Sequence, residues 1–580
     1  MLKQLLLFLL LQSTATQAQV APPPFIKLVQ PFNSSVKAPA ARQYIIGSTC
    51  ANCKLSINEQ PVKVHATGAF AFLIDLAGDS SFIIRAEGES KVVTRTIQYQ
   101  YTTPQLAKPV ATTDIVYLQT LPEGDLVLQA GDVIKLKAKA LPAASLKTSW
   151  GSILYEMPVD NTGGMPGIYQ GEYVVKPSDT FMLKKMMVIL TDSAGKTISR
   201  ETSSKFSVQS AYASDVAITK GRLAHLEYGL GDDRLGGAKI GYLDSNILLK
   251  LTGKFGNDYR VQLAPGKTAY IPGELVQLLP KGSYPPASLT DKITVLGDSL
   301  YDYVRLQLFA RLPYQSMQFI NPSTIVVDVY GATNNTNWIT QLETAKEIKS
   351  VDYEQLAEGI FRVSILLNHP QHWGHQLYYQ GNTLVIKVKR QPANSLLKHL
   401  VIAVDAGHGG SNNGAVGATG IYEKELTLAL SLKLQQALEK EGAKVIMTRT
   451  TEQFFDNKER ILFYRDSMPD LLLSIHLNSS ADPFFAGGTG TFYRYIGFKP
   501  LSNLIYKRLL QLGLNEYGNT GSFNFMLNSP TEYPNALIET LFLSNLDEEA
   551  KIINPIFQQQ MADKIVAGIK DFLEHCKNTH

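Results

Sequence analysis

The order of strand-like and helix-like segments changes abruptly near residue 400, and this change constrains the fold more than any other feature. Before it, short segments of alternating apolar and polar residues dominate. After it, helical periodicity at 424–441, 458–467, 499–513 and 548–574 alternates with strand-like runs at 401–404, 443–447, 471–475, 489–494 and 536–541. Alternating strands and helices are typical of an α/β sheet with both faces covered. We therefore predict a multidomain chain of N-terminal β-sandwich and barrel modules followed by a C-terminal α/β domain.

The β-rich part is too long for one hydrophobic core and divides into several modules. Alternating stretches such as Phe70–Ile74, separated by Gly, Asn and Asp turns, indicate a small β-sandwich. A linker rich in Pro and Thr (102–113) precedes a second region of this kind, and shorter, glycine-dense strands follow at 218–279. We predict a β-sandwich at 19–105, a second, Ig-like sandwich at 106–212, a module resembling bacterial SH3-like barrels at 213–285, a further β domain at 286–392, and the α/β domain at 393–580.

The N-terminus has the pattern of a secretory signal peptide. Lys3 precedes an apolar run at 5–11, and small residues lead to Ala18. This run is far shorter than the ~20 residues that span a bilayer, and no later run is long enough, so we predict an exported chain without a transmembrane segment. The net charge of +4 over 580 residues gives no support to a nucleic-acid partner.

Cysteine is rare, with only Cys50, Cys53 and Cys576 in the chain. The Cys50-Ala-Asn-Cys53 segment has the spacing of half a zinc site, of a redox pair or of a local disulfide. A second pair for a four-cysteine zinc site is missing, and the strand-rich surroundings are unlike thioredoxin. Because exported proteins meet an oxidising environment, a local disulfide that staples a turn is the favoured interpretation.

Groups suited to metal binding or proton transfer occur at several points of the α/β region. His408 follows the first apolar strand in "VIAVDAGHGG", where glycines let the backbone turn sharply and leave the imidazole uncovered. His476 ends another strand, Glu423 opens the first helix, and Glu539 interrupts a mostly apolar strand. In an α/β sheet, ligands gather beyond the carboxyl ends of the strands. A buried ionised carboxylate is costly unless it is paired or metal-linked.

Each of these residues also has a purely structural interpretation. His408 could cap a helix, Glu423 could be a first-turn carboxylate, and His476 could be a core histidine. Glu539 could pair with a distant basic group. Taken together in one domain, however, two imidazoles and one carboxylate form the open three-ligand set of a catalytic zinc ion, which leaves a fourth position for water.

Residues 400–575 resemble the catalytic domain of zinc-dependent N-acetylmuramoyl-L-alanine amidases, the amidase type 3 family. The segments "VDAGHGG", "GAVGATGIYEK", "MTRTTEQ", "ERILFYRDSMPDLLLSIHLNS" and "YPNALIETLFLSN" carry the resemblance, in the family's order and spacing. It implies that His408, Glu423 and His476 bind Zn²⁺, that Glu539 is the general base, and that Asn478 contacts substrate. The chain departs from the family pattern at Ala406 (often proline) and at Thr520 and Asn528 (often arginine), the last two at expected substrate-groove positions.

The resemblance implies hydrolysis of the amide bond between the lactyl group of N-acetylmuramic acid and L-alanine in peptidoglycan. It implies a place in the periplasm or cell envelope of a Gram-negative bacterium, and residues 286–392 resemble the AMIN modules that direct such amidases to the envelope. The alternative is a catalytically silent scaffold that binds peptidoglycan through the same fold. A zinc peptidase lacks sequence support such as a His-Glu-x-x-His motif. The sequence gives no protein partner.

Two further segments bear on the site. His369, His372 and His375 have even spacing, but no carboxylate follows closely, and we favour a surface or packing loop over a second metal site. Some relatives insert a plugging helix between the last zinc histidine and the catalytic glutamate. Here the parts 481–488 and 516–534 of that interval read as loops, so we predict an open site.

Overall fold

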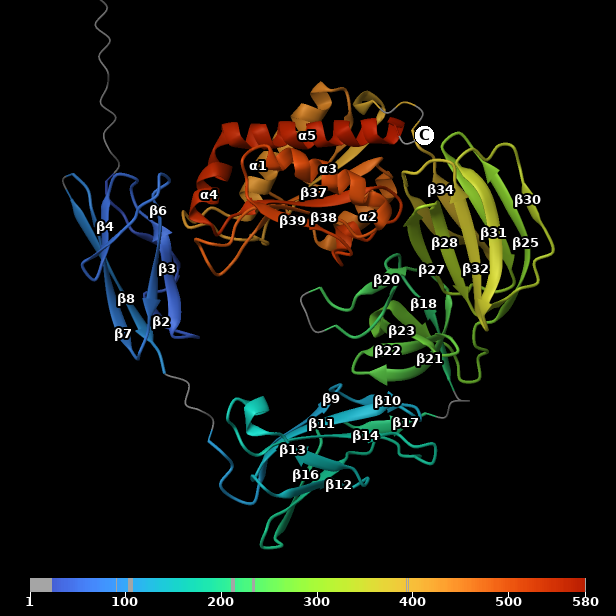
Figure 1. Ribbon diagram of the computed structural model, residues 1–580, viewed down its shortest axis with the longest axis horizontal. Coiled ribbons are helices and arrows are strands. Elements are labelled where there is room, and N and C mark those ends of the chain that lie inside the picture. Colours follow the sequence, from blue (N-terminus) through green and yellow to red (C-terminus); the bar gives the residue numbers. More distant parts are fainter. Residues whose placement is uncertain are drawn as a thin grey trace, which may run out of the picture. The chain divides into compact units, whose positions relative to one another are not determined.

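The computed structural model describes residues 23–89, 91–102, 108–209, 214–231, 235–392, 394 and 396–578 (Figure 1). The predicted signal peptide, residues 1–18, lies outside the described residues. The described residues form two compact units. One comprises the residues up to Thr102 together with Val416–Ile421, and the other comprises the residues from 108 to Ala415 and from Tyr422 onward. No helix among the described residues is long and apolar enough to cross a membrane.

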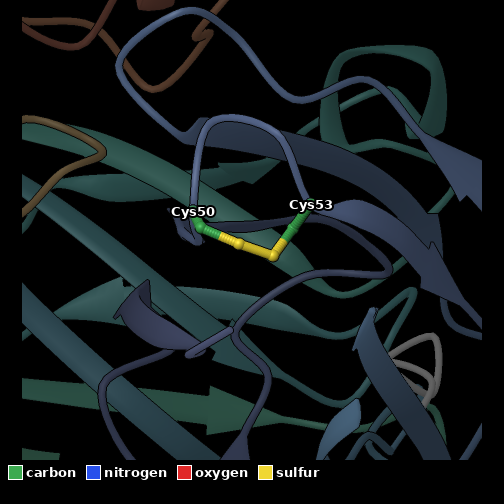
Figure 2. Close-up of a disulfide and its surroundings, with 2 residues drawn as sticks. All are labelled: Cys50 and Cys53. Carbon is green, nitrogen blue, oxygen red and sulfur yellow. A yellow bond between two sulfur atoms is a disulfide. The ribbon is translucent and has the colours of Figure 1, made fainter. Parts of the chain in front are cut away.

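The first unit contains two sheets, one in the order β1-β3-β6 and one in the order β2-β8-β7-β4-β5. Ile45 and Phe70 of the first sheet and Ile84 and Ile97 of the second belong to one buried core. A disulfide joins Cys50 to Cys53 in the turn between β3 and β4, which confirms the predicted local staple (Figure 2). The strands are β1 (Lys27–Gln30), β2 (Ser35–Lys37), β3 (Arg42–Ser48), β4 (Lys54–Ile57), β5 (Gln60–Val62), β6 (Ala69–Asp75), β7 (Ser80–Glu87) and β8 (Val92–Gln100).

The second unit begins with a seven-stranded sheet in the order β16-β15-β12-β13-β14-β11-β9. Two strands of this region leave it: β10 pairs with β17 and also with β21, so that a nine-stranded sheet continues past the predicted boundary at residue 212. The strands are β9 (Ile115–Leu121), β10 (Leu126–Leu128), β11 (Val133–Ala140), β12 (Ser145–Thr148), β13 (Ile153–Glu156), β14 (Ile168–Val174), β15 (Met187–Thr191), β16 (Thr197–Glu201), β17 (Phe206–Val208), β18 (Asp215–Thr219), β19 (His225–Glu227), β20 (Lys239–Tyr242), β21 (Leu248–Phe255), β22 (Asp258–Ala264), β23 (Lys267–Pro272) and β24 (Val276–Leu278).

The region 288–389 holds two more sheets, with the orders β29-β25-β26-β34-β33 and β27-β28-β32-β31. Their buried side chains are continuous with those of the preceding region, since one cluster includes Ala217 and Ile271 as well as Val304 and Ile386. The strands are β25 (Ser288–Gly297), β26 (Tyr301–Leu308), β27 (Tyr314–Ile320), β28 (Ser323–Tyr330), β29 (Ala332–Thr333), β30 (Ile339–Gln341), β31 (Ile348–Ala357), β32 (Ile360–Leu367), β33 (His375–Gln380) and β34 (Thr383–Lys389).

The C-terminal region is an α/β domain around a six-stranded sheet in the order β36-β35-β37-β40-β38-β39. Helices α1 and α3 both pack against α5 (Figure 1). Helix α2 packs Ile461 and Tyr464 against Ala403 and Leu472 of the sheet. The elements are β35 (Val401–Ala406), α1 (Glu423–Lys440), β36 (Lys444–Ile446), α2 (Asn457–Ser467), β37 (Leu471–Asn478), β38 (Thr489–Phe492), α3 (Lys499–Leu510), β39 (Glu516–Thr520), β40 (Asn535–Phe542), α4 (Leu546–Ile553) and α5 (Pro555–Asn578).

Two features of this domain differ from the pattern that the sequence predicts. The predicted helix 548–574 is two helices, because α4 ends before Asn554 and Pro555 opens α5. A proline lacks the N–H that a helix interior needs but suits the first helical position. The predicted loop 516–534 begins with the strand β39, which pairs in parallel with β38. Its sequence, Glu-Tyr-Gly-Asn-Thr, is short and polar, so pairing with β38 rather than apolar periodicity defines it.

Candidate metal centre

The turn after β35 has an unusual backbone conformation. His408 has a φ of 61°, and Gly409 and Gly410 follow with φ values of 132° and 54°. A positive φ is uncommon outside glycine and costs free energy, so the surroundings must hold His408 in place. At Gly407 a Cβ atom would lie 2.5 Å from Cε1 of His476. This glycine therefore makes room for the imidazole of His476, a more specific role than the sequence indicated.

Three side chains from different elements converge beside this turn. Glu423 is the first residue of α1, and His476 lies near the end of β37. Oε1 of Glu423 lies 3.1 Å from Nε2 of His408 and 3.2 Å from Nδ1 of His476. All three ligand atoms lie within 4.8 Å of one another. Elsewhere in the described ranges, no other group of three His, Cys, Asp or Glu side chains has this proximity.

The charges at this cluster are balanced by hydrogen bonds. Burial raises the pKa of Glu423, but the hydrogen bonds with His408 and His476 outweigh it and hold the pKa well below its ordinary value. Burial alone would lower the pKa of His476, but the hydrogen bond and charge of Glu423 raise it above the ordinary value. The backbone N–H groups of Ala415 and Leu477 also donate to the Glu423 carboxylate, at 2.8 and 2.9 Å. The carboxylate is thus kept ionised in a place that favours positive charge.

Asn412 orients His408 from outside the cluster. Nδ1 of His408 lies 3.0 Å from Oδ1 of Asn412, which can only accept, so Nδ1 carries the proton and Nε2 is free to face Glu423. Such a partner on the second ring nitrogen is usual for histidines that bind metals. Sequence reasoning missed Asn412, because an asparagine in the glycine-rich stretch reads as an ordinary turn residue.

Two buried arginines hold the backbone that carries His408. Arg449 donates to the carbonyl oxygens of Ala406 and Gly407 at 3.0 and 2.8 Å. Arg460 donates to the carbonyl oxygen of His408 and forms a buried ion pair of 2.7 Å with Asp405. Both side chains are at most 2% exposed. This role could not be predicted from the sequence, since arginines in a loop and in the first turns of a helix are usually solvated.

Glu539 lies on β40 next to the cluster. Its register partner on β37 is His476, and paired residues of neighbouring strands lie on the same face of a sheet. The charge of Glu539 also contributes to the raised pKa of His476, after the larger effects of burial and of Glu423. The structure therefore brings together all four residues that the sequence singled out.

The other expected substrate residues have different surroundings. Asn478 is half-buried, and its side-chain oxygen accepts a hydrogen bond of 2.8 Å from the backbone N–H of Ser479. Asn528 is only 1% exposed and donates to the carbonyl oxygen of Phe492 and to Asn535. The expectation that Asn528 lies at a substrate groove is wrong, because the residue is a buried link between the loop and the sheet. Thr520 is exposed at the end of β39.

The three histidines at 369–375 do not converge. His369 pairs with Glu347 at 2.6 Å, His372 donates to the carbonyl oxygen of Phe319 at 2.8 Å, and His375 lies 2.9 Å from the hydroxyl of Ser316. His372 and His375 are buried, so the segment is a packing loop and not a surface loop. Gln371 donates to the carbonyl oxygen of Gly497 at 2.6 Å, which links the loop to the α/β domain.

The fold and this cluster define an α/β domain with a candidate metal centre at the carboxyl ends of its strands. The model of the family described as N-acetylmuramoyl-L-alanine amidase matches residues 402–571. The chain is 31% identical over 177 residues to the uncharacterized protein YqiI of Bacillus subtilis. The aligned region covers 30% of this chain and 84% of YqiI. The chain belongs to the N-acetylmuramoyl-L-alanine amidase family.

Two further similarities have the same extent along this chain. The N-acetylmuramoyl-L-alanine amidase AmiC of Escherichia coli O6:H1 is 30% identical over 219 residues, which cover 30% of this chain and 52% of AmiC. The catalytic domain of CwlV, an N-acetylmuramoyl-L-alanine amidase from Bacillus (Paenibacillus) polymyxa, is 33% identical, with 30% of this chain and 98% of that structure covered and a TM-score of 0.29. This chain thus spans about half of AmiC.

Proposed function

We propose that this chain is a zinc-dependent amidase that hydrolyses the bond between the lactyl group of N-acetylmuramic acid and L-alanine in peptidoglycan. The convergence of His408, Glu423 and His476 within 4.8 Å carries the proposal, because two imidazoles and one carboxylate are an open ligand set for catalytic zinc. The family membership supports the reaction. A silent scaffold would have no need for an ionised, buried glutamate between two histidines.

The donor set fits a dication. His408 presents Nε2 and His476 presents Nδ1 toward the same carboxylate oxygen, and the Glu423 carboxylate stays ionised. When bound, zinc supplies a water molecule of lowered pKa and polarises the carbonyl of the amide. Asn412, Arg449 and Arg460 keep His408 in position, so the ligand geometry is set before substrate arrives.

Glu539 is the proposed general base. Its carboxylate, on the same face of the sheet as His476, accepts a proton from the attacking water and then donates it to the nitrogen of the departing L-alanine. In this hydrolysis one C–N bond breaks and one C–O bond forms, and the products are a lactyl carboxylate and a free peptide amine. Asn478, two residues beyond His476, remains a proposed substrate contact.

The proposed site is open without an activator. Every residue between His476 and Glu539 is described, and α3 is the one α-helix in that interval. Helix α3 packs against α5 and against β38. We therefore expect the full chain to act on a soluble muropeptide without any added protein.

The remaining parts are proposed to place this activity in the cell envelope. We propose export by the segment 1–18, to the periplasm or envelope of a Gram-negative bacterium, with peptidoglycan as the partner. The two sheets within 24–101 support the proposed sandwich module, and the two sheets within 288–389 support the AMIN-like module. The seven-stranded sheet within 115–201 supports the Ig-like module. The strands between 215 and 278 support an SH3-like module, although β10 and β17 join its sheet.

The test is digestion of purified peptidoglycan by the full chain. New ends identified by mass spectrometry should be free muramoyl lactyl carboxylates and peptides beginning with L-alanine, and chelation should abolish their formation. New reducing sugar ends, or cleavage inside the stem peptide, would contradict the proposal. Binding of peptidoglycan without any new ends would favour the silent scaffold.

A further inference from the structure

Four aromatic rings form a continuous series that begins at His476. Phe525 makes an edge contact with the imidazole of His476, with ring centres 5.8 Å apart. Phe523 stacks on Phe525 at 6.3 Å, Phe492 lies 4.7 Å from Phe523, and Tyr517 lies 6.4 Å from Phe492. We call Phe492, Tyr517, Phe523 and Phe525 the aromatic row. It joins β38, β39 and the loop before β40 to the candidate metal centre.

The aromatic row lies on the face of the sheet that carries Glu539. Gly490 of β38 is the antiparallel register partner of Glu539, and Phe492 is the partner of Leu537 on the same strand, so these side chains share one face. A Cβ atom at Gly490 would lie 2.8 Å from Cδ1 of Tyr517. Glycine at 490 therefore lets the ring of Tyr517 lie against the backbone directly beside the proposed general base.

The loop that carries Phe523 and Phe525 is held by hydrogen bonds of the residue between them, Asn524. Asn524, between Phe523 and Phe525, accepts a hydrogen bond of 2.8 Å from Arg494 and donates one of 2.9 Å to the carbonyl oxygen of Gly237. The side chain of Asn524 is thus fixed from two directions. The adjacent rings are therefore held in a defined position, and Phe525 packs partly against the core of the domain while remaining half-buried.

Three of the four rings of the row are accessible to a ligand, whereas Phe492 is buried. Tyr517 is 51% exposed, and Phe523 and Phe525 are half-buried. Covering apolar ring surface is favourable, and exposed aromatic surface beside a catalytic group is typical of binding sites. None of the four side chains of the row carries a charge. The stem peptide, rich in carboxylates and amines, would call for charged partners, whereas the C–H face of a pyranose ring stacks on an aromatic ring.

We propose that the aromatic row is a glycan subsite, at which a sugar ring of the glycan strand stacks on Tyr517 and Phe523 while the lactyl amide lies at His476 and Glu539. This inference rests on the proposed amidase function and adds to it a residue set for glycan recognition. Substrates that carry the sugar should therefore bind better than a lactyl peptide that lacks it.

The experiment compares two substrates of the full chain: a disaccharide that carries the lactyl-linked peptide, and a D-lactoyl peptide of the same sequence without sugar. Tyr517→Ala and Phe523→Ala should each raise KM for the first substrate about fivefold to tenfold, the scale of one aromatic stacking contact. Their kcat values, and both parameters for the D-lactoyl peptide, should stay within about twofold of wild type, since stacking contributes to binding only. Tyr517→Phe should restore KM, and Tyr284→Ala, which removes a ring that is 89% exposed elsewhere, is the control.

The outcomes separate this inference from the proposed function. Equal losses on both substrates, or no change on either, would overturn the glycan subsite while leaving the amidase intact. If the wild-type chain hydrolyses neither substrate, the amidase proposal fails. Calorimetric titration with a peptide-free oligomer of N-acetylglucosamine and N-acetylmuramic acid then decides the subsite, because Tyr517→Ala must weaken that binding and an unchanged affinity would refute it.

Discussion

The candidate metal centre and the loop 369–375 each contain a group of three side chains that includes histidines, but only the first group converges on one point. At the candidate metal centre, His408 and His476 lie far apart in sequence, yet both face one oxygen of Glu423, at 3.1 and 3.2 Å. In the loop 369–375, three histidines lie close in sequence, yet each contacts a separate partner. Convergence on a shared point, and not spacing along the chain, distinguishes a metal site from a packing loop.

The two groups also differ in how their surroundings shift the pKa values of the histidines. The charge of Glu423 raises the pKa of His476 despite its burial, so the cluster favours positive charge. Burial lowers the pKa of His372 and lowers that of His375 to about 3, and the second effect is increased by the neighbouring His372. Burial in this loop therefore disfavours a positive charge on His372 and His375. A dication suits the first group, whose side chains share one point and include an ionised carboxylate, whereas the side chains of the second group have separate partners.

The largest expected effect is the loss of zinc from the metal centre. His408→Ala and His476→Ala each remove one of the three proposed ligands, so the purified variants should contain almost no zinc and show no hydrolysis. Metal analysis by mass spectrometry measures this directly. The matched control is His369→Ala, from the other group, which should keep one zinc ion per chain. Full zinc retention in both ligand variants would show that the site lies elsewhere.

The second prediction distinguishes the proposed general base, Glu539, from the proposed zinc ligands. Glu539→Gln keeps the shape of the side chain but cannot accept a proton, so kcat should fall by roughly two to four orders of magnitude with zinc content unchanged. Turnover on a soluble muropeptide, together with metal analysis of the same sample, provides the measurement. A variant with wild-type turnover would remove Glu539 from the mechanism, and one without zinc would make it a ligand.

Much of the catalytic domain could be predicted from the sequence, because strands such as 401–406 and 471–478 are apolar and helices such as 423–440 are periodic. The four candidate site residues could be predicted because His408, Glu423 and His476 stand at or near the ends of strands or helices, and because the carboxylate of Glu539 interrupts an apolar strand. Asn412, Arg449 and Arg460 could not, since their role depends on contacts between distant segments. Strand β39 could not be predicted, because its pairing with β38 and not its own composition makes it a strand.

Contacts across the boundary near residue 392 could not be predicted from the sequence either. The sequence change there predicts two separate domains, but Trp373, which is 2% exposed, contacts the ring of Phe572 of α5 at 5.6 Å. Lys389 forms an ion pair of 2.7 Å with Asp470, and the backbone N–H of His375 donates to the carbonyl oxygen of Thr531 at 2.7 Å. A composition shift marks where the folding pattern changes and does not reveal how much surface the two parts bury together.

A third prediction tests this junction. Trp373→Ala removes a large buried side chain between the histidine loop and α5, so the free energy of unfolding should fall by about 3–5 kcal/mol. At temperatures where the variant is folded, zinc content should equal that of wild type. Urea denaturation monitored by circular dichroism gives the stability. A loss below about 1 kcal/mol would mean that the α/β domain is energetically independent of the loop. The control Trp338→Ala removes a tryptophan that is 52% exposed and should cost far less.

The smallest effect is a pH dependence that belongs to the histidine loop alone. With a pKa of about 3 in the folded chain, His375 stays neutral on folding, whereas in the unfolded chain it takes up a proton below pH 6.5. The unfolded state therefore binds more protons as the pH falls, so the stability contribution of neutral His375 is complete above pH 6.5 and is lost progressively toward pH 3. In His375→Gln this loss is absent, while the effect of His372 remains in both proteins. Between pH 7.5 and pH 5, the wild-type free energy of unfolding should fall by about 1–2 kcal/mol more than that of the variant. Parallel stability curves for the two proteins would show that His375 is protonated in the folded chain, and the contrast between the two groups of histidines would then not extend to their charge.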